Sequence, residues 1–502
     1  MIQRLSLVAV LVVAVCSVAA FAQGTRTDLV VAVPDEPPSL DPTTNASAAI
    51  DQILQENVYE GLVRVAPDGE LEPGLATAFE VSADGLTYTF SLRQDVLFHD
   101  SRPFTAADVV STFERDRDPK TGHPNPSYYA QIDRIEAPDP FTVVFRMKDV
   151  DASFLSLLAL GDSVILPSPI LEALASRPVG TGPFRFVEWR TGDLLRLERF
   201  PGYYRAGVPH LARVTFRFIS DPASALASLL AGDVDLIARI PAETALSVED
   251  DPRFKTVAGP QNLVQLLAMN KARAPFSDLK VRQAIAHALD RAVIIEGTMS
   301  RYGIPIGSHL TPSSPYYVDL TGFYPYNVDE ARRLLADAGY PQGFSAVLTL
   351  PQNYEIHVRT GEIIADLLER VGIHLKIELV EWGQWLSRVF NQADYDLTVM
   401  GHVGKLDPGA MLSNYGAETP NYYYRRGYDD PVLDGLLAEG RRTVDLERRK
   451  TIYAQAQEIL AQDVVNYFIQ DPYQIFVMKA GIAGFNPYPI YSIQVADVYW
   501  SS

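Results

Sequence analysis

Cysteine is almost missing from this chain of 502 residues, which contains one, Cys16. Cys16 lies in an apolar stretch near the first residue. Val15 before it is a poor match to a lipoprotein cleavage site, which needs a small residue there, so we do not expect a lipoprotein. Cleavage after Ala22 leaves no cysteine, which excludes disulfides, thiolate metal sites and a cysteine nucleophile. A large hydrophobic core must then hold the protein together.

Long apolar runs are missing after the first 22 residues. At the start, Arg4, the apolar run 5–15 and the small residues Ala20 and Ala22 predict an export signal over residues 1–22 that is cleaved. The run is shorter than the about 20 residues of a membrane span, although an uncleaved anchor is an alternative. The sequence therefore predicts a soluble protein that is secreted through the inner membrane into the periplasm.

Positive charge is in deficit, with 43 Lys and Arg against 62 Asp and Glu and a net charge of −19. A surface that binds DNA or RNA needs the opposite sign, so nucleic acid is not an expected partner. Strong net negative charge favours a soluble monomer. The composition, 47% hydrophobic and 21% charged, is ordinary for a globular protein, and this length predicts two or three domains.

Catalytic motifs are also missing. The chain has no His-Glu-x-x-His zinc motif, no Gly-x-Ser-x-Gly elbow and no phosphate loop, and its eight histidines lack metal-ligand spacing. Gly161-Asp162-Ser163 faintly resembles a motif of one class of lipases and esterases, but three residues often match by chance. We expect no enzyme, no cofactor and no metal; an exported hydrolase is the least favoured alternative.

Strand patterns alternate with helix patterns through most of the chain, which predicts α/β lobes. A strand is expected at residues 29–33, and two alternating runs around Asp84-Gly85 predict a hairpin. Thr105 and Asp108 have the spacing of a capping box, as do Asn327 and Glu330. Residues 446–460 predict a long amphipathic helix.

The stretch 270–299, NKARAPFSDLKVRQAIAHALDRAVIIEGTM, predicts a helix that Ser277 caps. Arg282 is expected mostly off its apolar stripe, which consists of Val281, Ala284, Ile285, Ala288 and Leu289. On pattern alone this is an ordinary amphipathic helix, which indicates fold rather than function. The residue order PFSDLKVRQAIAHALDR, however, closely resembles the start of the third lobe in extracytoplasmic solute-binding proteins of family 5, which serve dipeptide, oligopeptide and nickel ATP-binding-cassette (ABC) importers.

Further phrases resemble this family in its order: PDEPPSLDPT after the first strand, VGTGPF at residues 179–184, a Gly-Tyr-Tyr phrase and GDVDL. The resemblance implies an α/β, bilobal periplasmic-binding-protein type II (clamshell) fold with an extra subdomain inserted in the first lobe. The expected division is a signal peptide at 1–22, lobe I at 23–64, 178–265 and 478–502, the inserted subdomain at 65–177, and lobe II at 266–477.

The resemblance also implies a function. The chain would be the substrate-binding component of an ABC importer, capturing a peptide or peptide-like solute in the periplasm by closure of its lobes. It would deliver this ligand to the membrane subunits of a permease, with the ATPase on separate chains. The alternative is the same fold with a non-peptide ligand, such as an opine, an oligosaccharide or a metal chelate.

Candidate ligand-binding residues follow from the positions that match the family. Trp382, His357 and Arg388 stand where peptide-binding members carry a tryptophan, a histidine and an arginine beside the pocket, and Trp382 can form an amphipathic pocket wall. A plain core tryptophan is the alternative for Trp382, and a mere tight turn is the alternative for VGTGPF as a ligand-facing hinge loop. The expected set also contains loop residues: Asn45, Tyr128, Thr181 and Tyr354.

The loop GHVGKLDPGAML, which starts at residue 401, departs from the family. Peptide-binding members often read Gly-Trp-x-x-Asp-x-x-Asp-Pro here, and the first aspartate grips the α-amino group of the ligand. In this chain His402 replaces the tryptophan, Lys405 stands at that aspartate, and one residue is missing before Asp407. Two like charges in contact cost on the order of several kcal/mol. We therefore expect Lys405 to meet an anionic or hydroxyl-rich ligand; alternatively, Lys405 points to solvent and Asp407 takes the amine.

Overall fold

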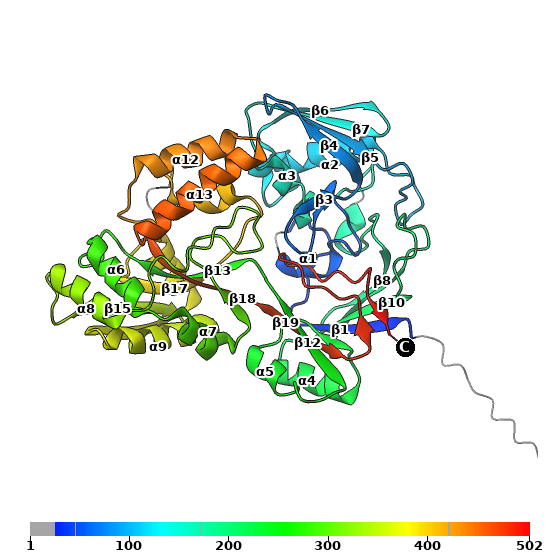
Figure 1. Ribbon diagram of the computed structural model, residues 1–502. Helices are drawn as coiled ribbons and strands as arrows, with labels where there is room; N and C mark the ends of the chain where they lie inside the picture. The colour runs from blue at the N-terminus through cyan, green and yellow to red at the C-terminus, as the bar shows by residue number, and fades with distance from the viewer. Residues whose placement is uncertain (1–25, 46, 171, 420–421, 502) are drawn as a thin grey trace, which may run out of the picture.

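The structure of the protein is a computed structural model that describes residues 26–45, 47–170, 172–419 and 422–501. The expected signal peptide at 1–22 lies outside the described residues. Three large sheets organise the chain (Figure 1). Within the described ranges, no helix combines the length and the apolar character that crossing a membrane requires.

A seven-stranded sheet forms the centre of what we call lobe I. Its strand order is β12 (Phe254–Gly259), β19 (Gln474–Lys479), β11 (Leu236–Ile237), β1 (Asp28–Val33), β10 (Arg213–Phe218), β9 (Leu194–Arg199) and β8 (Phe184–Arg190). β1 is parallel to both β10 and β11. The elements that accompany the sheet are α1 (Ala48–Leu54), α4 (Pro222–Ala231), α5 (Ala242–Leu246), β20 (Ile482–Ala483) and β21 (Tyr499–Trp500). The strand expected at 29–33 is confirmed, and its Leu29, Val31 and Val33 are buried.

A four-stranded antiparallel sheet forms the inserted subdomain, at the top of Figure 1. Its order is β4 (Ala76–Val81), β5 (Thr87–Leu92), β7 (Thr142–Met147) and β6 (Ile132–Asp139). The other elements are β2 (Val63–Val65), β3 (Leu71–Pro73), α2 (Ala106–Asp116), α3 (Phe154–Leu157), and the short helices η1 (Pro119–Thr121), η2 (Pro126–Tyr129), η3 (Gly161–Ser163) and η4 (Glu172–Ala175). The hairpin at Asp84-Gly85 and the capping box of Thr105 and Asp108 are both confirmed.

A six-stranded sheet forms what we call lobe II, on the left of Figure 1. Its order is β14 (Gly303–Pro305), β18 (Asn466–Pro472), β13 (Leu263–Met269), β17 (Leu397–Val403), β15 (Phe344–Pro351) and β16 (Ile373–Val380). Its helices are α6 (Leu279–Ala288), α7 (Arg291–Met299), α8 (Val328–Asp337), α9 (Glu355–Glu369), α10 (Trp382–Trp385), the π-helix η5 (Leu386–Asn391), α11 (Pro408–Leu412), η6 (Ser413–Tyr415), α12 (Pro431–Arg442) and α13 (Leu446–Gln462). The amphipathic helix expected at 446–460 is confirmed by α13.

Helix α6 corrects two details of the sequence prediction. Its apolar stripe is confirmed, with all five side chains buried. Its N-cap, however, is Asp278, whose side chain accepts a hydrogen bond from the backbone of Lys280, and not Ser277. Arg282 is buried rather than off the packed face, because its guanidinium donates to backbone carbonyls of Phe276 and Asp463. A buried arginine is tolerated when several carbonyls satisfy its donors.

Two crossings connect the lobe sheets. One runs from β12 to β13 through residues 260–262, and the other runs from β18 to β19 through Tyr473. Asp471 lies between them, because its carboxylate accepts a hydrogen bond from the backbone of Leu263 at 3.0 Å. These pairings favour a return crossing near residue 473 over the expected bound at 477/478. The division into two lobes and an inserted subdomain is itself a proposal.

Candidate functional site

Three parallel strands of lobe II end at one edge of its sheet. β15 pairs in parallel with both β16 and β17. Tyr354 follows β15, Trp382 follows β16 and Lys405 follows β17. Ligands of α/β proteins bind outside the carboxyl ends of such strands. The topology therefore brings these three predicted residues to the same edge.

An aromatic face forms part of this edge. The rings of Trp382 and Trp385 are stacked, with centroids 5.2 Å apart and planes 7° apart, and Tyr354 meets Trp382 edge-on at 5.2 Å. Trp385 is the buried core tryptophan, and its indole N–H donates to Thr398. Trp382 is only half-buried and Tyr354 is 38% exposed. Both can therefore offer apolar surface and a polar tip to a ligand.

His357 and His402 support this face from beneath. His357 contacts Gln265 through Nδ1 at 3.1 Å and accepts from the backbone N–H of Gly401 at 3.2 Å. His402 shares a 2.6 Å hydrogen bond with the hydroxyl of Tyr423. Burial lowers the pKa of His357 to about 4, and burial together with the neighbouring His357 lowers the pKa of His402 to about 3. Both rings are therefore neutral near pH 7 and supply no cation.

Lys405 is exposed, and it forms no hydrogen bond or ion pair with any residue that the structure describes. Its loop is anchored on both sides. The backbone N–H of Gly404 donates to the carbonyl of Asn262 at 2.5 Å, and a Cβ at Gly404 would lie 2.1 Å from the Asn262 side chain. On the other side, Asp407 is 2% exposed. The backbone that carries the exposed Lys405 is thus fixed on both sides.

Asp407 is occupied by Arg449 of α13. Nη1 of Arg449 lies 2.7 Å from Oδ2 of Asp407, and Nη2 donates to Oδ1 at 3.0 Å. Oδ1 also accepts from the backbone of Gly409, so that Asp407 caps α11. Arg449 is 4% exposed and additionally donates to the hydroxyl of Tyr316. The negative charge of Asp407 is therefore already neutralised.

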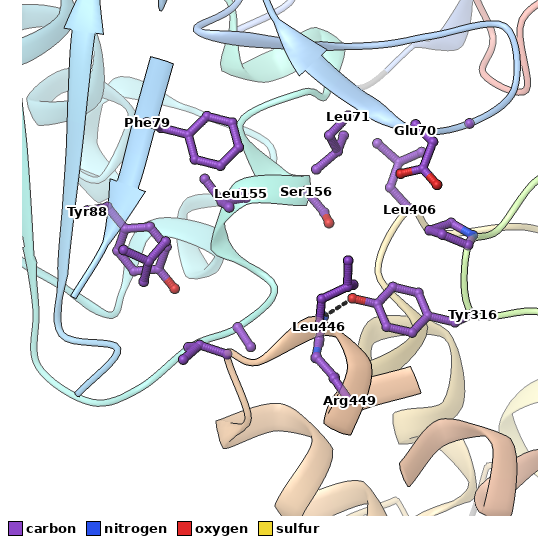
Figure 2. A pocket seen from close by; sticks show the side chains of 15 residues that line it. Glu70, Leu71, Phe79, Tyr88, Leu155, Ser156, Tyr316, Leu406, Leu446 and Arg449 are labelled. Carbon is purple, nitrogen blue, oxygen red and sulfur yellow. Dashed lines mark hydrogen bonds between the residues drawn. The ribbon is translucent and has the colours of Figure 1, made fainter. Parts of the chain in front are cut away.

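A cavity of about 330 Å³ lies beside this pair, between the subdomain and lobe II (Figure 2). Leu71, Phe79 and Leu155 face it from the subdomain, while Tyr316 and Leu406 face it from lobe II. The other labelled lining residues are Glu70, Tyr88, Ser156, Leu446 and Arg449. A largely apolar lining with a few polar groups suits a small organic solute.

The guanidinium of Arg388 is already paired with two acidic side chains. It lies 3.0 Å from Glu378 and 3.4 Å from Asp394. Two carboxylates on one guanidinium leave little unpaired positive charge for a ligand. Sequence position alone gave no sign of these partners, because they come from β16 and from the loop before β17.

Thr181 lies inside lobe I. It is fully buried and donates to Glu60 at 2.7 Å. A Cβ at Gly180 would lie 1.9 Å from the carbonyl oxygen of Val58, and one at Gly182 would also meet the backbone of residue 57. The glycines of VGTGPF thus permit a close approach of two backbone segments within the lobe.

The two remaining predicted residues also lie apart from lobe II. Asn45, after β1, is half-buried and its side chain accepts from the backbone of Ser47. Tyr128 packs at the margin of the subdomain core. The serine of the Gly-Asp-Ser triplet is fully buried, and Ser163 donates to the carbonyl of Leu157. This environment gives no support to Ser163 as a nucleophile.

Arg449, Tyr316 and Leu406 were missed by sequence reasoning. A signal for Arg449 does exist, because residue 449 lies three positions before Ile452 and four before Tyr453 on the buried face of α13. An arginine at such a position requires hydrogen-bond acceptors, and an acidic side chain is one kind of partner that supplies them. Among the described residues, no group of three or more His, Cys, Asp or Glu side chains could hold a metal ion.

The chain is similar to known proteins in sequence and in overall fold. The family described as "Bacterial extracellular solute-binding proteins, family 5 Middle" matches residues 70–423. The glutathione-binding protein GsiB of Pectobacterium atrosepticum is 30% identical over 485 residues, 94% of each chain. The periplasmic binding protein AgaA of A. tumefaciens R10, solved with agropinic acid, is 31% identical with a TM-score of 0.73 over 95% of this chain and 99% of that one. CtaP, an ABC transporter substrate-binding protein of Listeria monocytogenes, is 26% identical with a TM-score of 0.86 over 95% and 100%.

Proposed function

Since the chain belongs to the bacterial extracellular solute-binding proteins of family 5, we propose that it captures a small, peptide-like carboxylic acid between its lobes. The protein is the solute-binding component of an ABC importer and works with the permease of that importer. Closure of the lobes around the ligand, with contacts from both sides, would give the permease a form to recognise. No bond of the ligand is made or broken in this scheme.

The exposed Lys405 carries the ligand assignment. An unpaired ammonium on a fixed loop attracts a carboxylate and repels a ligand amine. The relatives give independent support, because glutathione and agropinic acid, named for GsiB and AgaA, are both carboxylic acids. The cavity beside Leu406 has room for an apolar part of the ligand.

The second candidate is an ordinary peptide held by its free amine on Asp407. The ion pair with Arg449 disfavours it, because an ammonium would have to compete with a guanidinium for the same two oxygens. An exported hydrolase is the third candidate, and its triplet serine is buried.

We also propose the cellular setting. Members of this family are periplasmic binding proteins. A signal at residues 1–22 that is cleaved after Ala22 would release this chain into the periplasm without a lipid anchor. The net charge of −19 supports a monomer.

Three dipeptide probes test the ligand class: free Ala-Ala, N-acetyl-Ala-Ala without an amine, and Ala-Ala amide without a carboxylate, with glutathione as a fourth. Binding to the folded state raises its stability by RT ln(1 + [L]/Kd), so thermal unfolding reports binding. We expect stabilisation by acids, the acetylated dipeptide included, and none by the amide.

Variants of two lysines test whether the positive charge of Lys405 binds the ligand. Lys405→Ala should weaken binding of the acids, while Lys376→Ala, another exposed lysine of lobe II, should leave it unchanged. Binding of Ala-Ala and its amide but not of the acetylated form, unaffected by Lys405→Ala, would instead establish the amine grip. Mass spectrometry of co-purified small molecules identifies the natural ligand independently.

A further inference from the structure

Lobe I has a sheet edge equivalent to the one that carries Lys405. β1 and β11 are parallel neighbours, with Ala32 opposite Ile237, and β1 ends on the side of the sheet that faces lobe II (Figure 1). Asp35 follows β1 and Arg239 follows β11. The carboxyl ends of parallel strands are where α/β sheets bind ligands. Arg239 therefore occupies a binding position by topology.

The guanidinium of Arg239 lacks a hydrogen-bonding partner. Its Nε and Nη2 are shielded from solvent, yet neither has a partner among the residues that the structure describes. It stacks on the ring of Tyr491, with the guanidinium carbon 3.5 Å from the ring centroid. Asp35 is near enough to influence Arg239 electrostatically but forms no ion pair with it. Burial lowers the pKa of Arg239 to about 10, so the side chain is still charged at neutral pH.

Three buried arginines of the chain show which partners the half-buried Arg239 lacks. Arg282 donates to backbone carbonyls, Arg425 pairs with Asp429, and Arg449 pairs with Asp407. Burying a charge without such partners is costly. An orphaned guanidinium that persists in a folded protein indicates a partner supplied from outside the chain.

The backbone holds Arg239 in an unusual conformation. Its φ is +57°, a left-handed value that side chains other than glycine rarely adopt. Hydrogen bonds on both sides enforce it, because Ala238 donates to the carbonyl of Ala32 and Ile240 donates to that of Ile475, each at 3.0 Å. Local strain of this kind is concentrated at functional sites.

The chain directly after Arg239 lines a cavity that residues of both lobes share. The residues that follow Arg239, Ile240 to Glu243, line this cavity of about 250 Å³ together with the start of α9 in lobe II. Glu355, which lines this cavity, directly follows Tyr354 of the aromatic face. A ligand at the edge of lobe II can thus meet the edge of lobe I when the lobes approach each other.

We propose that Arg239 is an anion-binding residue of lobe I, so that the ligand carries two carboxylates, one for Lys405 in lobe II and one for Arg239 in lobe I. This inference rests on the proposed function for the role of Lys405. A dicarboxylate would bridge the lobes by charge and stabilise the closed form, because each of its ends is bound by a different lobe. The planar fork of Arg239 matches a carboxylate in a bidentate way.

The test uses the full mature chain with arginine side chains labelled for NMR. The Nε–H signal of Arg239 is assigned by its loss in Arg239→Lys. Succinate and glutathione, which each carry two carboxylates, are titrated, and Ala-Ala amide serves as the probe without a carboxylate. We expect a saturable shift of the Arg239 signal with the two acids and none with the amide.

Affinity for glutathione is then measured by calorimetry. Arg239→Gln should bind at least about tenfold more weakly, as expected for loss of a charged hydrogen-bonded pair. Arg253→Gln, which removes an exposed arginine of the same lobe that is paired with Asp251, should bind like the wild type.

Arg239→Gly should be more heat-stable without ligand, because it removes both the unpaired charge and the side chain at a left-handed backbone position. Weaker binding of glutathione by this stabilised variant as well would separate lost binding from unfolding.

Each outcome decides between the two proposals. Equal affinity of Arg239→Gln and wild type overturns the inference but leaves the solute-binding function intact. A shift of Arg239 with succinate, combined with acid binding that Lys405→Ala leaves unchanged, supports the anion site and overturns the role assigned to Lys405. An unmoved Arg239 signal without stabilisation by any acid overturns both.

Discussion

Asp407 and Arg449 form an ion pair that is almost completely shielded from solvent, with their closest atoms 2.7 Å apart. The pair connects the loop after β17 to helix α13. Lys405 lies two residues before Asp407, so its position depends on this connection. Asp407, the alternative amine grip of the sequence analysis, is thus paired with Arg449 and supports the loop that carries Lys405.

Arg449→Met should destabilise the protein by about 3–5 kcal/mol, because it leaves the Asp407 carboxylate buried without its partner. The double variant Arg449→Met/Asp407→Asn should recover part of this loss, since no uncompensated charge is left. Arg448→Met, which removes an exposed neighbour paired with Glu439, should change stability by less than about 0.5 kcal/mol. Urea unfolding of the four proteins measures these differences, and a single variant as stable as the wild type contradicts the pair's role.

Truncation of Trp385 should mainly lower stability, whereas truncation of Trp382 should mainly weaken ligand binding. Trp385→Ala removes a buried ring and should cost about 3–5 kcal/mol of stability. Trp382→Ala removes a half-buried ring at the cleft edge and should cost less stability but weaken binding of glutathione. Thermal unfolding and calorimetry separate the two effects. If Trp382→Ala binds like the wild type, the aromatic face is not part of the ligand site.

Helix periodicity made much of the fold predictable. The stripe of α6, the hairpin at Asp84-Gly85 and the cap at Asn327, which accepts from the backbone of Glu330, all depend on residues close in sequence. Ser277 and Asp278 can both cap a helix. The structure selects Asp278, because its side chain accepts from the backbone of Lys280 and its carbonyl accepts from that of Arg282, whereas Ser277 lies in the preceding turn.

The site was less predictable because its chemistry depends on distant partners. Tyr354, Trp382 and Lys405, predicted one by one from the family resemblance, lie at one edge because each follows a strand of the same sheet. The partners of Arg388 and the lack of partners at Arg239 arise from residues scattered along the chain. No local pattern in the sequence distinguishes an arginine that is satisfied from one that is not.

Asp471 lies beside the two chain crossings between the lobe sheets, which we call the hinge. Its carboxylate should make stability depend on pH. Burial raises its pKa to about 7, although backbone N–H groups of residues 261–263 act in the opposite direction. The folded state therefore binds this proton more tightly than the unfolded state. The resulting stabilisation is complete below about pH 4 and is lost as the pH rises through 7.

Asp471→Asn should remove this contribution. The wild type should lose at least about 1 kcal/mol more than the variant between pH 5 and pH 8, as measured by urea unfolding at both values. Asp51, whose pKa is also raised to about 7 by burial and by Asp162, adds a slope of its own. Asp51→Asn therefore serves as a comparison at a site away from the hinge. Identical slopes in wild type and Asp471→Asn would show that the hinge carboxylate is ionised throughout.

Gly180 offers the clearest test of how VGTGPF functions. A Cβ at this position would lie 1.9 Å from the carbonyl oxygen of Val58, closer than any real contact, and the obstacle is backbone that cannot rotate away. Gly180→Ala should therefore cost about 3 kcal/mol or more. Gly322→Ala, where a Cβ meets nothing within 4 Å, should be nearly neutral. Thermal unfolding measures both variants.

The same pair of variants distinguishes a structural loop from a ligand-facing hinge. If VGTGPF is held against residues 57–58 inside lobe I, Gly180→Ala lowers the unfolding temperature, but the protein that is still folded binds glutathione with unchanged affinity. If the loop instead contacts the ligand, Gly180→Ala keeps its stability and loses affinity. The buried hydroxyl of Thr181 favours the first result, because the one hydrogen that it can donate is already used by Glu60 inside the lobe.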